Sequence, residues 1–228
     1  MSAVQVTGYL GAGKSTLAAH LSAEGLVTNE VPALMAPAAG TPVIAVVDAA
    51  NLITCLADPL VAPLIRAQVT GAGLVVVSRG DIIDAGPAVS VAKELTTCPV
   101  LKAPMGQVEP AHADSLSIST TATPMDLTDQ FARWDYEGPA KLRPEALEQL
   151  MAERPAGTYR MWGTALTTKG TVAVEIAGQV RQTASTDDAE TRLSAVGPRN
   201  VFRPENMALA FAEAASKSAF MAGMFGHR

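Results

Sequence analysis

A glycine-rich stretch near the N-terminus carries residues whose types and spacing could do chemistry. Residues 8–15, GYLGAGKS, match the pattern G-x-x-x-x-G-K-[ST]. Glycines let a backbone turn tightly, so that successive N–H groups point inward at phosphate oxygens. We expect Lys14 to reach the β- and γ-phosphates and the Ser15 hydroxyl to bind Mg²⁺. The predicted nucleotide-binding residues of this stretch are Gly8, Gly11, Ala12, Gly13, Lys14, Ser15 and Thr16.

The elements that must position this loop are also visible in the sequence. An apolar run, Ala3–Thr7, precedes the loop, and a helical pattern, Ser15–Ala23, follows it. A helix that starts here would direct the positive end of its dipole at an anion. A glycine-rich turn with a chance lysine is the structural alternative. The coincidence of motif and context favours a phosphate site.

Two further apolar runs end in acids. The run VIAVVD ends at Asp48, which could hold the water shell of Mg²⁺ or cap the helix that begins directly after it. The run LVVVSRGD ends at Asp81, which could accept hydrogen bonds from the guanine N1–H and 2-amino groups, a donor pair that adenine does not offer. A solvated turn is the alternative for Asp81. Both questions stay open at this level.

The first half alternates apolar runs with helical patterns, which is typical of an α/β fold with a parallel sheet. We assign residues 1–125 to a P-loop nucleotide-binding domain. Pro59 and Pro63 should break the second of its helices. The expected strands are Ala3–Thr7, Pro42–Val47, Gly73–Val77 and Pro99–Ala103, and the expected helices are Ser15–Ala23, Ala50–Gln68 and Pro87–Leu95.

The pattern changes after a stretch rich in Ser, Thr and Pro, in which Ser115–Ser119 is one possible short strand. We assign residues 126–156 to a linker and a helix, Pro144–Ala152, and residues 157–228 to a small α+β domain. The expected elements of that domain are the strands Thr158–Thr164, Thr171–Ile176, Gln179–Thr183 and Thr191–Val196 and the helix Pro204–Ser216.

Composition and charge exclude several function classes. The formal net charge is −5 and no basic run occurs, which argues against a nucleic-acid groove. No apolar run is long enough to span a bilayer, and the first strand begins too early for a signal peptide. Only two cysteines occur, Cys55 and Cys98, as expected for a cytoplasmic protein. Neither pairs at ligand spacing with His20, His112 or His227, so we expect no transition-metal site.

Several segments together resemble one family. The stretches VTGYLGAGKSTL, VIAVVDAANLI, GLVVVSRGDII and CPVLKAPMGQVEP, followed by TYRMWGTAL and VAVEIAGQVRQT, resemble in that order the CobW-type P-loop GTPases. That family is associated with metal homeostasis and cofactor metallation. The resemblance implies a P-loop parallel sheet followed by a small α+β domain like the CobW C-terminal domain. It also implies Mg²⁺ and GTP or GDP as ligands.

The resemblance carries over to some residues and fails at one segment. Asp81 matches the acid of the guanine-reading N-K-x-D motif, and Ser78 and Arg79 stand where that motif has Asn and Lys. Between the P-loop helix and VVDA, the family has a switch segment, a C-x-C-C motif and an acid-bearing strand. Here the interval is only Glu24–Thr41, in which Asn29 and Glu30 resemble an N-E pair of the family.

With the strand order that this resemblance implies, the short interval predicts a truncated sheet of four strands, in the order P-loop, VVDA, VVVSRGD and PVLKA. Ala3–Thr7 would then be an exposed edge, which is an aggregation liability. We expect the C-terminal domain, the Glu24–Thr41 segment or a second subunit to cover it. A homodimer through this edge or a protein client is therefore a candidate partner.

The interpretation that follows is a guanine-nucleotide-binding, CobW-like protein with weak or absent GTP hydrolysis. Three alternatives remain open. The chain could be a competent GTPase that uses Asp48 or Glu30 for Mg²⁺. It could be a P-loop kinase for a small substrate, or a partner-binding module without catalysis.

Overall fold

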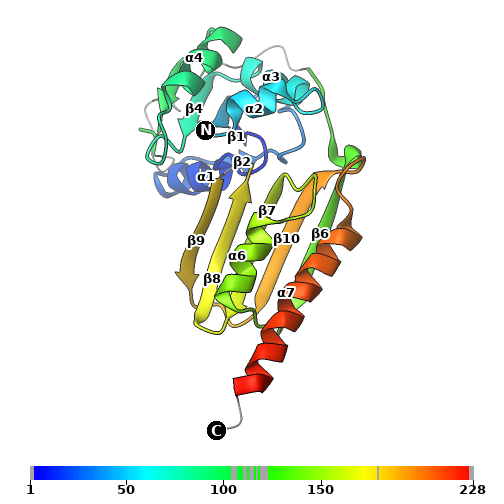
Figure 1. The fold of residues 1–228 in the computed structure, drawn as a ribbon. Helices are drawn as coiled ribbons and strands as arrows, with labels where there is room; N and C mark the ends of the chain where they lie inside the picture. Colours follow the sequence, from blue (N-terminus) through cyan, green and yellow to red (C-terminus); the bar gives the residue numbers. More distant parts are fainter. Residues whose placement is uncertain are drawn as a thin grey trace. The chain divides into compact units, whose positions relative to one another are not determined.

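The computed structural model describes residues 3–103, 107–109, 112, 116, 118, 123–178 and 180–225. The chain divides into two compact units, Met1–Thr128 and Asp129–Arg228 (Figure 1). Each unit has a five-stranded sheet of its own, so the fold is a mixed α/β fold with a parallel sheet followed by an antiparallel one. No described helix is both long enough and apolar enough to cross a bilayer.

The sheet of the first unit is parallel, with the strand order β2-β1-β3-β4-β5. The predicted order of its four main strands is thereby confirmed. Three of them are fully buried apolar runs, as expected for strands covered on both faces. The strands are β1 (Val4–Thr7), β2 (Thr28–Glu30), β3 (Val43–Asp48), β4 (Leu74–Ser78) and β5 (Val100–Lys102).

The connections of this unit show where the chain changes the side of the sheet to which it adds strands. From β1 it passes through α1 to β2 on one side, whereas from β3 it passes to β4 and β5 on the other. Right-handed crossovers then place α1 on the opposite face from α3 and α4. The point of reversal lies between β1 and β3, where open α/β sheets bind their ligands. The helices are α1 (Lys14–Ala23), α2 (Leu52–Ala57), α3 (Ala62–Thr70) and α4 (Gly86–Leu95).

The single helix expected over residues 50–68 is broken in two, as its prolines predicted. The chain leaves α2 at Asp58, and the Asp58 carboxylate accepts a hydrogen bond from the Leu60 amide at 2.8 Å. Pro63 then lies in the first turn of α3, where its missing N–H costs nothing. The break leaves the short helix α2 directly beyond the end of β3.

The predicted open edge on β1 is wrong, because the segment 24–41 supplies a strand. β2 pairs in parallel with β1, with Val4 opposite Thr28 and Val6 opposite Glu30. Of the three expected covers, the segment 24–41 is therefore the one found, and the sheet has five strands rather than four. β1 is paired on both sides and leaves no edge for a homodimer to extend.

Two buried glutamines hold the rest of this segment in place. The Gln5 side chain accepts a hydrogen bond from the Ala38 amide at 3.1 Å and donates to the Thr41 hydroxyl. Gln68, only 2 % exposed, donates to the carbonyl of Met35 at 2.9 Å. Because a buried amide must be hydrogen-bonded, these contacts fix the return path from β2 to β3.

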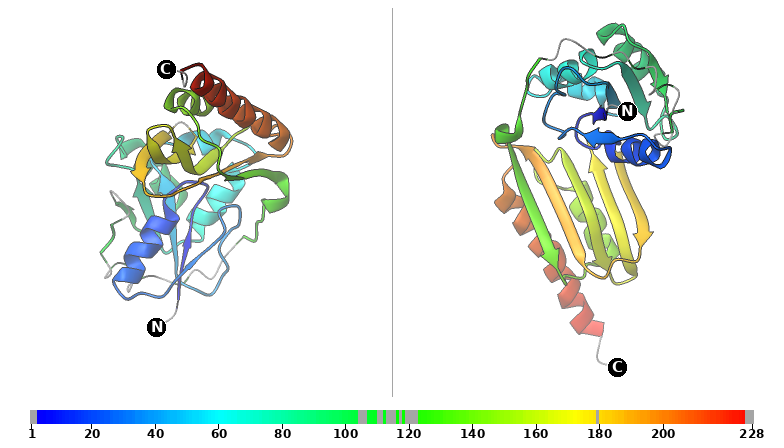
Figure 2. Two further views of the ribbon diagram at one scale, coloured as in Figure 1. Left: turned by 90° about the horizontal axis from the view of Figure 1, so that it is seen from below. Right: turned by 180° about the vertical axis from the view of Figure 1, so that it is seen from behind.

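The second unit is an antiparallel sheet with the order β6-β10-β7-β8-β9. The helices α6 and α7 both cover one face of it (Figures 1 and 2). Its core lies between that face and the helices, around Met161, Ile176, Leu193 and Phe202. The elements are β6 (Phe131–Gly138), α6 (Pro144–Ala152), β7 (Arg160–Thr167), β8 (Gly170–Ala177), β9 (Val180–Thr186), β10 (Thr191–Pro198) and α7 (Pro204–Phe225).

The domain boundaries differ from the predicted ones because residues 126–156 are not a linker. β6 lies in this segment and pairs with β10 along its whole length, so the second unit begins at Asp129. Its sequence alternates Ala, Trp and Tyr with Arg, Asp and Glu, a period-2 signal that could have identified the strand. Of the possible strand at 115–119, only Leu116 and Ile118 are described, and Ile118 forms an isolated bridge with Pro42.

The close approach of β7 and β10 can be tested by a substitution at Gly163. Its φ is +133°, and a Cβ there would overlap the backbone carbonyl of Arg192. We expect Gly163→Ala to reduce the free energy of unfolding of the second unit by about 3 kcal/mol or more. The only two tryptophans, Trp134 and Trp162, lie in this unit, so their fluorescence in urea reports on it.

Gly170→Ala is the matched control, because its φ is +117° but no atom lies within 4 Å of a Cβ at that position. Only the backbone strain should appear there, about 1–2 kcal/mol. Equal losses in the two variants would show that the close approach to β10 has no cost of its own.

Candidate functional site

The predicted phosphate loop lies between β1 and α1, at the carboxyl end of the sheet. Gly13 has φ +94°, in the left-handed region that favours glycine. Gly8 has φ +155°, and a Cβ there would overlap the carbonyl oxygen of Val46 on β3. The loop therefore passes so close to β3 that its first glycine cannot be replaced without moving the backbone.

The loop leads directly into an uncapped helix. Gly13 is the N-cap of α1, and no side chain caps this end. The first amides of a helix have no partner within the helix, so they are available to an anion. Lys14 is half-buried at the first position, and Ser15 and Thr16 are exposed in the first turn. The loop thus presents backbone donors, a cation and two hydroxyls together.

The end of β2 brings a carboxylate to this loop. The Ser15 hydroxyl donates a hydrogen bond to Glu30 Oε2 at 2.8 Å. Both residues are exposed, so neither oxygen is removed from solvent or from an ion. A hydroxyl and a carboxylate are oxygen ligands of the kind that Mg²⁺ takes, together with water and phosphate oxygens. The residues present therefore fit a magnesium ion at Ser15 and Glu30.

Asp48, the other magnesium candidate, is surrounded by protein donors. It is 6 % exposed, and its Oδ1 accepts a hydrogen bond from the Ala50 amide at 2.9 Å. Its Oδ2 accepts from the Asn51 side chain at 2.6 Å and from the Arg79 guanidinium at 2.5 Å. Both carboxylate oxygens are thus engaged. These contacts hold Asp48 against the turn before α2 and against the loop after β4, whereas the N-cap of α2 is Asn51 and that end has no side-chain cap hydrogen bond. The predicted cap is therefore not observed, and magnesium binding at Asp48 stays a prediction.

The loop after β4 is tied to the phosphate loop and to Asp48. The buried Ser78 hydroxyl donates a hydrogen bond to the Ala12 carbonyl at 2.8 Å. Arg79 has φ +59°, a left-handed conformation that is uncommon for a non-glycine residue. Its guanidinium reaches Asp48 on the neighbouring strand. The ion pair holds the strained residue in place.

Asp81 lies beyond this contact, in the turn after β4. It is exposed, and the amides of Ile82 and Ile83 both lie within 3.3 Å of the Arg79 carbonyl, which closes the turn. The carboxylate of Asp81 is therefore accessible to a ligand from solvent. Its role in reading a base stays a prediction.

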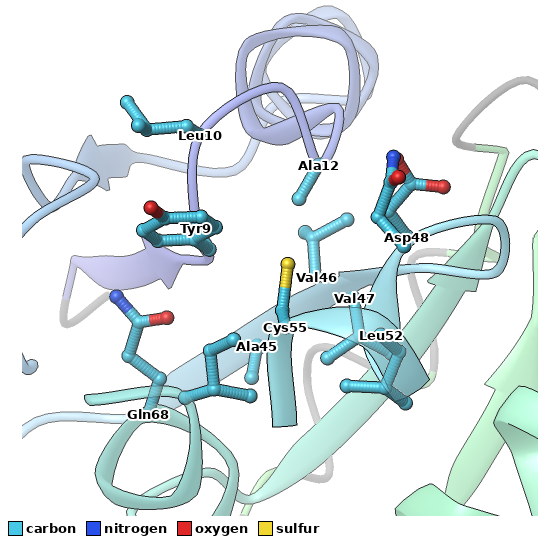
Figure 3. A pocket seen from close by; sticks show the side chains of 12 residues that line it. Tyr9, Leu10, Ala12, Ala45, Val46, Val47, Asp48, Leu52, Cys55 and Gln68 are labelled. Carbon is cyan, nitrogen blue, oxygen red and sulfur yellow. The ribbon is translucent and has the colours of Figure 1, made fainter. Parts of the chain in front are cut away.

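A pocket adjoins the phosphate loop on the side of α2 and α3 (Figure 3). It contains about 360 Å³ of empty space, its mouth included. Figure 3 shows the Cys55 sulfur pointing into the pocket, toward Ala12. Burial, and then the charges of Asp48 and Asp58, raise the pKa of the Cys55 thiol to about 11. The lining is mostly apolar: Tyr9, Leu10, Ala12, Ala45, Val46, Val47, Asp48, Asn51, Leu52, Cys55, Ile65 and Gln68.

The sequence does not predict Asn51 or Cys55 as lining residues of this pocket. Asn51 directly precedes α2, in the position of a helix cap, and this local signal could have identified it. Within the described ranges, no group of three or more His, Cys, Asp or Glu side chains could hold a metal. The ring of His20 on α1 contacts the Val108 carbonyl at 3.0 Å.

Comparisons with known proteins do not identify a family for this chain. No protein-family model matches the sequence, and no curated protein matches it significantly. Among solved structures, the Zn(II)-bound YjiA GTPase from E. coli is similar, with 14% identity and a TM-score of 0.38, over 94% of this chain and 98% of that chain. A Zn(II)-bound triple mutant of YjiA gives 15% identity and a TM-score of 0.37, over 93% and 98%. These likenesses are too distant to assign a family.

The Asp48–Arg79 pair can be tested by its effect on stability. We expect Asp48→Asn to lower the free energy of unfolding of the first unit by about 2–4 kcal/mol, because a guanidinium that is 12 % exposed loses its counter-charge. Circular dichroism in urea measures this change, and tryptophan fluorescence of the second unit provides an internal control. In an Arg79→Gly background, which relieves both charge and φ strain, Asp48→Asn should cost much less. An undiminished cost would show that Asp48 acts through α2 alone.

The raised pKa of Cys55 predicts a slow thiol. At pH 8 a pKa of about 11 leaves roughly one thiol in a thousand ionised, against about one in ten at the ordinary value of 9.0. In a Cys98→Ala background, iodoacetamide should therefore modify native Cys55 about a hundredfold more slowly than the urea-unfolded chain, as followed by mass spectrometry. Because the folded state holds this proton more tightly, its contribution to stability is lost as pH rises from 9.0 toward 11. Equal rates in native and unfolded chains would contradict the burial.

Proposed function

We propose that the first unit binds a guanine nucleotide with Mg²⁺ and hydrolyses it weakly or not at all. The observation that carries this proposal is the glycine loop, which places Lys14 and Ser15 at an uncapped helix N-terminus. The loop lies between β1 and β3, where the order of the strands along the chain reverses. In this proposal the backbone amides of Gly11 and of residues 13–15 bind the phosphate oxygens, whereas the Ala12 amide donates to the Tyr9 carbonyl within the loop. Lys14 neutralises the charge of the terminal phosphates.

Ser15 and Glu30 would hold the magnesium ion, which neutralises charge that develops on the phosphates when it is bound. Their contact at 2.8 Å supports this assignment. Asp48 is the weaker candidate, because its two oxygens already accept three protein donors. Of the two ways in which this chain could coordinate Mg²⁺, the one through Glu30 is therefore favoured.

The loop after β4 would read the base. Ser78 anchors this loop to the phosphate loop, so that the base and phosphate subsites keep a fixed spacing. Arg79 is directed to Asp48, which leaves only its aliphatic stem for contact with a purine. Asp81 supplies the acceptor pair that guanine N1–H and the 2-amino group require. This loop therefore supports guanine over adenine.

Weak hydrolysis follows from what the segment 24–41 contains. Hydrolysis of a nucleotide needs a group that orients the attacking water, and loops that close on the γ-phosphate. The only acids in this segment are Glu24 and Glu30, and it has no Gln, His, Lys or Arg. Glu30 is engaged with Ser15, so we propose that the protein retains nucleotide rather than turning it over. On the resemblance of its sequence to the CobW-type GTPases, that retention would serve metal homeostasis or cofactor metallation.

Binding and turnover can be measured separately. Calorimetric titration with GTP, GDP and ATP, with and without Mg²⁺, should show a guanine preference, and a phosphate-release assay should show little or no product. Lys14→Ala should weaken the affinity for GTP more than tenfold, because it removes a charge-assisted contact to phosphate. An undiminished affinity would show that the loop is not the site. ATP preference with acceptor-dependent turnover would indicate a kinase, and no nucleotide binding would indicate a partner-binding module.

The magnesium assignment has a matched pair of variants. Glu30→Gln should reduce the enhancement of GTP affinity by Mg²⁺ while leaving Mg²⁺-free binding nearly unchanged. Glu24→Gln makes the same chemical change on an exposed residue that lies directly after α1, and it should behave as wild type. Equal Mg²⁺ dependence in the two variants would overturn the role of Glu30.

A further inference from the structure

A cleft in the second unit lies between the helix α6 and the strand β9, and none of its lining residues belongs to the proposed nucleotide site. It contains about 810 Å³ of empty space, its mouth included. α6 supplies one wall and β9 the other. The lining residues are Pro144, Leu147, Glu148, Met151, Thr167, Lys169, Val172, Arg181, Gln182 and Thr183.

The floor of the cleft is apolar. Leu147 and Met151 are core residues of α6 that are 3 % and 6 % exposed, and Val172 on β8 packs against the same core. On β9, Arg181 and Thr183 lie opposite Ile176 and Val174, which are core residues, so both belong to the face that α6 covers elsewhere. An apolar side chain of a ligand would thus find a floor continuous with the core.

The rim of the cleft is cationic. The Arg154 guanidinium donates to the carbonyls of Met151 and Gly178, which places it at the end of α6. Its pKa is lowered by burial and then by the like charge of Arg181, so the two guanidinium groups are close. In the part of the chain that the structure describes, neither Arg181 nor Lys169 forms an ion pair. Glu148 is the one acid in the lining, in a protein whose net charge is −5.

β9 is an edge strand, because it pairs only with β8. Half of the backbone N–H and C=O groups of such a strand point away from its neighbour and are free to pair with another chain. The opposite edge, β6, carries Arg133, Asp135 and Glu137, charges of the kind that discourage edge pairing. β9 has the sequence VRQTAST, with one charge in seven residues.

We propose that β9 and the cleft beside it bind an extended acidic peptide segment of a partner protein, which adds a strand to the sheet. The main chain of the peptide pairs with the free edge of β9. On the face that carries Arg181 and Thr183, the acidic side chains of the peptide lie next to Arg181 and in the field of Lys169, and the apolar side chain between them lies at the mouth of the cleft. A second copy of this chain is a poorer occupant, because its β9 has no carboxylate within the strand and its nearest acids, Asp187 and Asp188, lie beyond the end of the strand.

A peptide of the sequence TETVTET, acetylated, amidated and fluorescently labelled, is a suitable probe. Side chains alternate along a strand, so its two Glu and its Val share one face and its Thr residues the other. We expect saturable binding to the full-length protein by fluorescence anisotropy, weakening as salt concentration rises. Hydrogen–deuterium exchange should slow at residues 180–186. The peptide TKTVTKT should bind at least tenfold more weakly.

Arg181→Glu should weaken binding of TETVTET about tenfold or more and should improve binding of TKTVTKT. Arg192→Glu is the matched control, because it makes the same charge change at an exposed residue on the opposite face of the same sheet, and it should leave both affinities close to wild type. Circular dichroism verifies that both variants fold.

Three outcomes would overturn the proposal. One is the absence of saturable TETVTET binding at millimolar peptide, and another is an equal effect of the two arginine variants. The third is self-association of the wild-type protein in sedimentation, with residues 180–186 protected as concentration rises, which would make a second copy the occupant. All of these readouts are independent of nucleotide, so they do not depend on the function proposed for the first unit.

Discussion

The contact between the Asp48 carboxylate and the Arg79 guanidinium connects the parts of the first unit that a ligand would touch. Asp48 is the last residue of β3, and its carboxylate accepts hydrogen bonds from Ala50 and Asn51, which precede α2. Arg79 directly follows β4. Ser78, next to Arg79, holds the phosphate loop at Ala12. Because both charged groups are nearly buried, neither can move without leaving the other uncompensated. The candidate site is therefore preorganised by contacts among its own loops.

The same contact determines which residues remain for chemistry. Engaged with Arg79 and Asn51, Asp48 has no oxygen without a protein donor. The exposed side-chain oxygens beside the phosphate loop are instead those of Ser15 on α1 and Glu30 at the end of β2. The segment Glu24–Thr41, only eighteen residues long, thus supplies both the cover of β1 and a carboxylate. Hydrogen bonds of the Gln5 side chain on β1 and of the Gln68 side chain on α3 hold that segment in place.

In the second unit, the feature that a ligand could use is an open strand edge beside a cleft. The antiparallel sheet of this unit is covered by helices on one face, and a cleft lies on that face between α6 and β9. An open strand edge, an apolar floor and unpaired cations meet there, which is a combination suited to an extended anionic segment. One chain then has a preorganised site for an anion at a helix N-terminus and a separate surface for a protein partner.

The sequence by itself determined the phosphate loop and the break near Pro59, because each follows from local spacing or proline chemistry, whereas the order β1-β3-β4-β5 was expected from the family resemblance. It did not determine β2, a three-residue strand too short for any periodic signal, or β6, whose alternation lay inside an apparent linker. Only the tertiary structure decided which partners the Asp48 carboxylate takes. That choice depends on Arg79, which is remote in sequence and reaches Asp48 only because β3 and β4 are neighbours in the sheet.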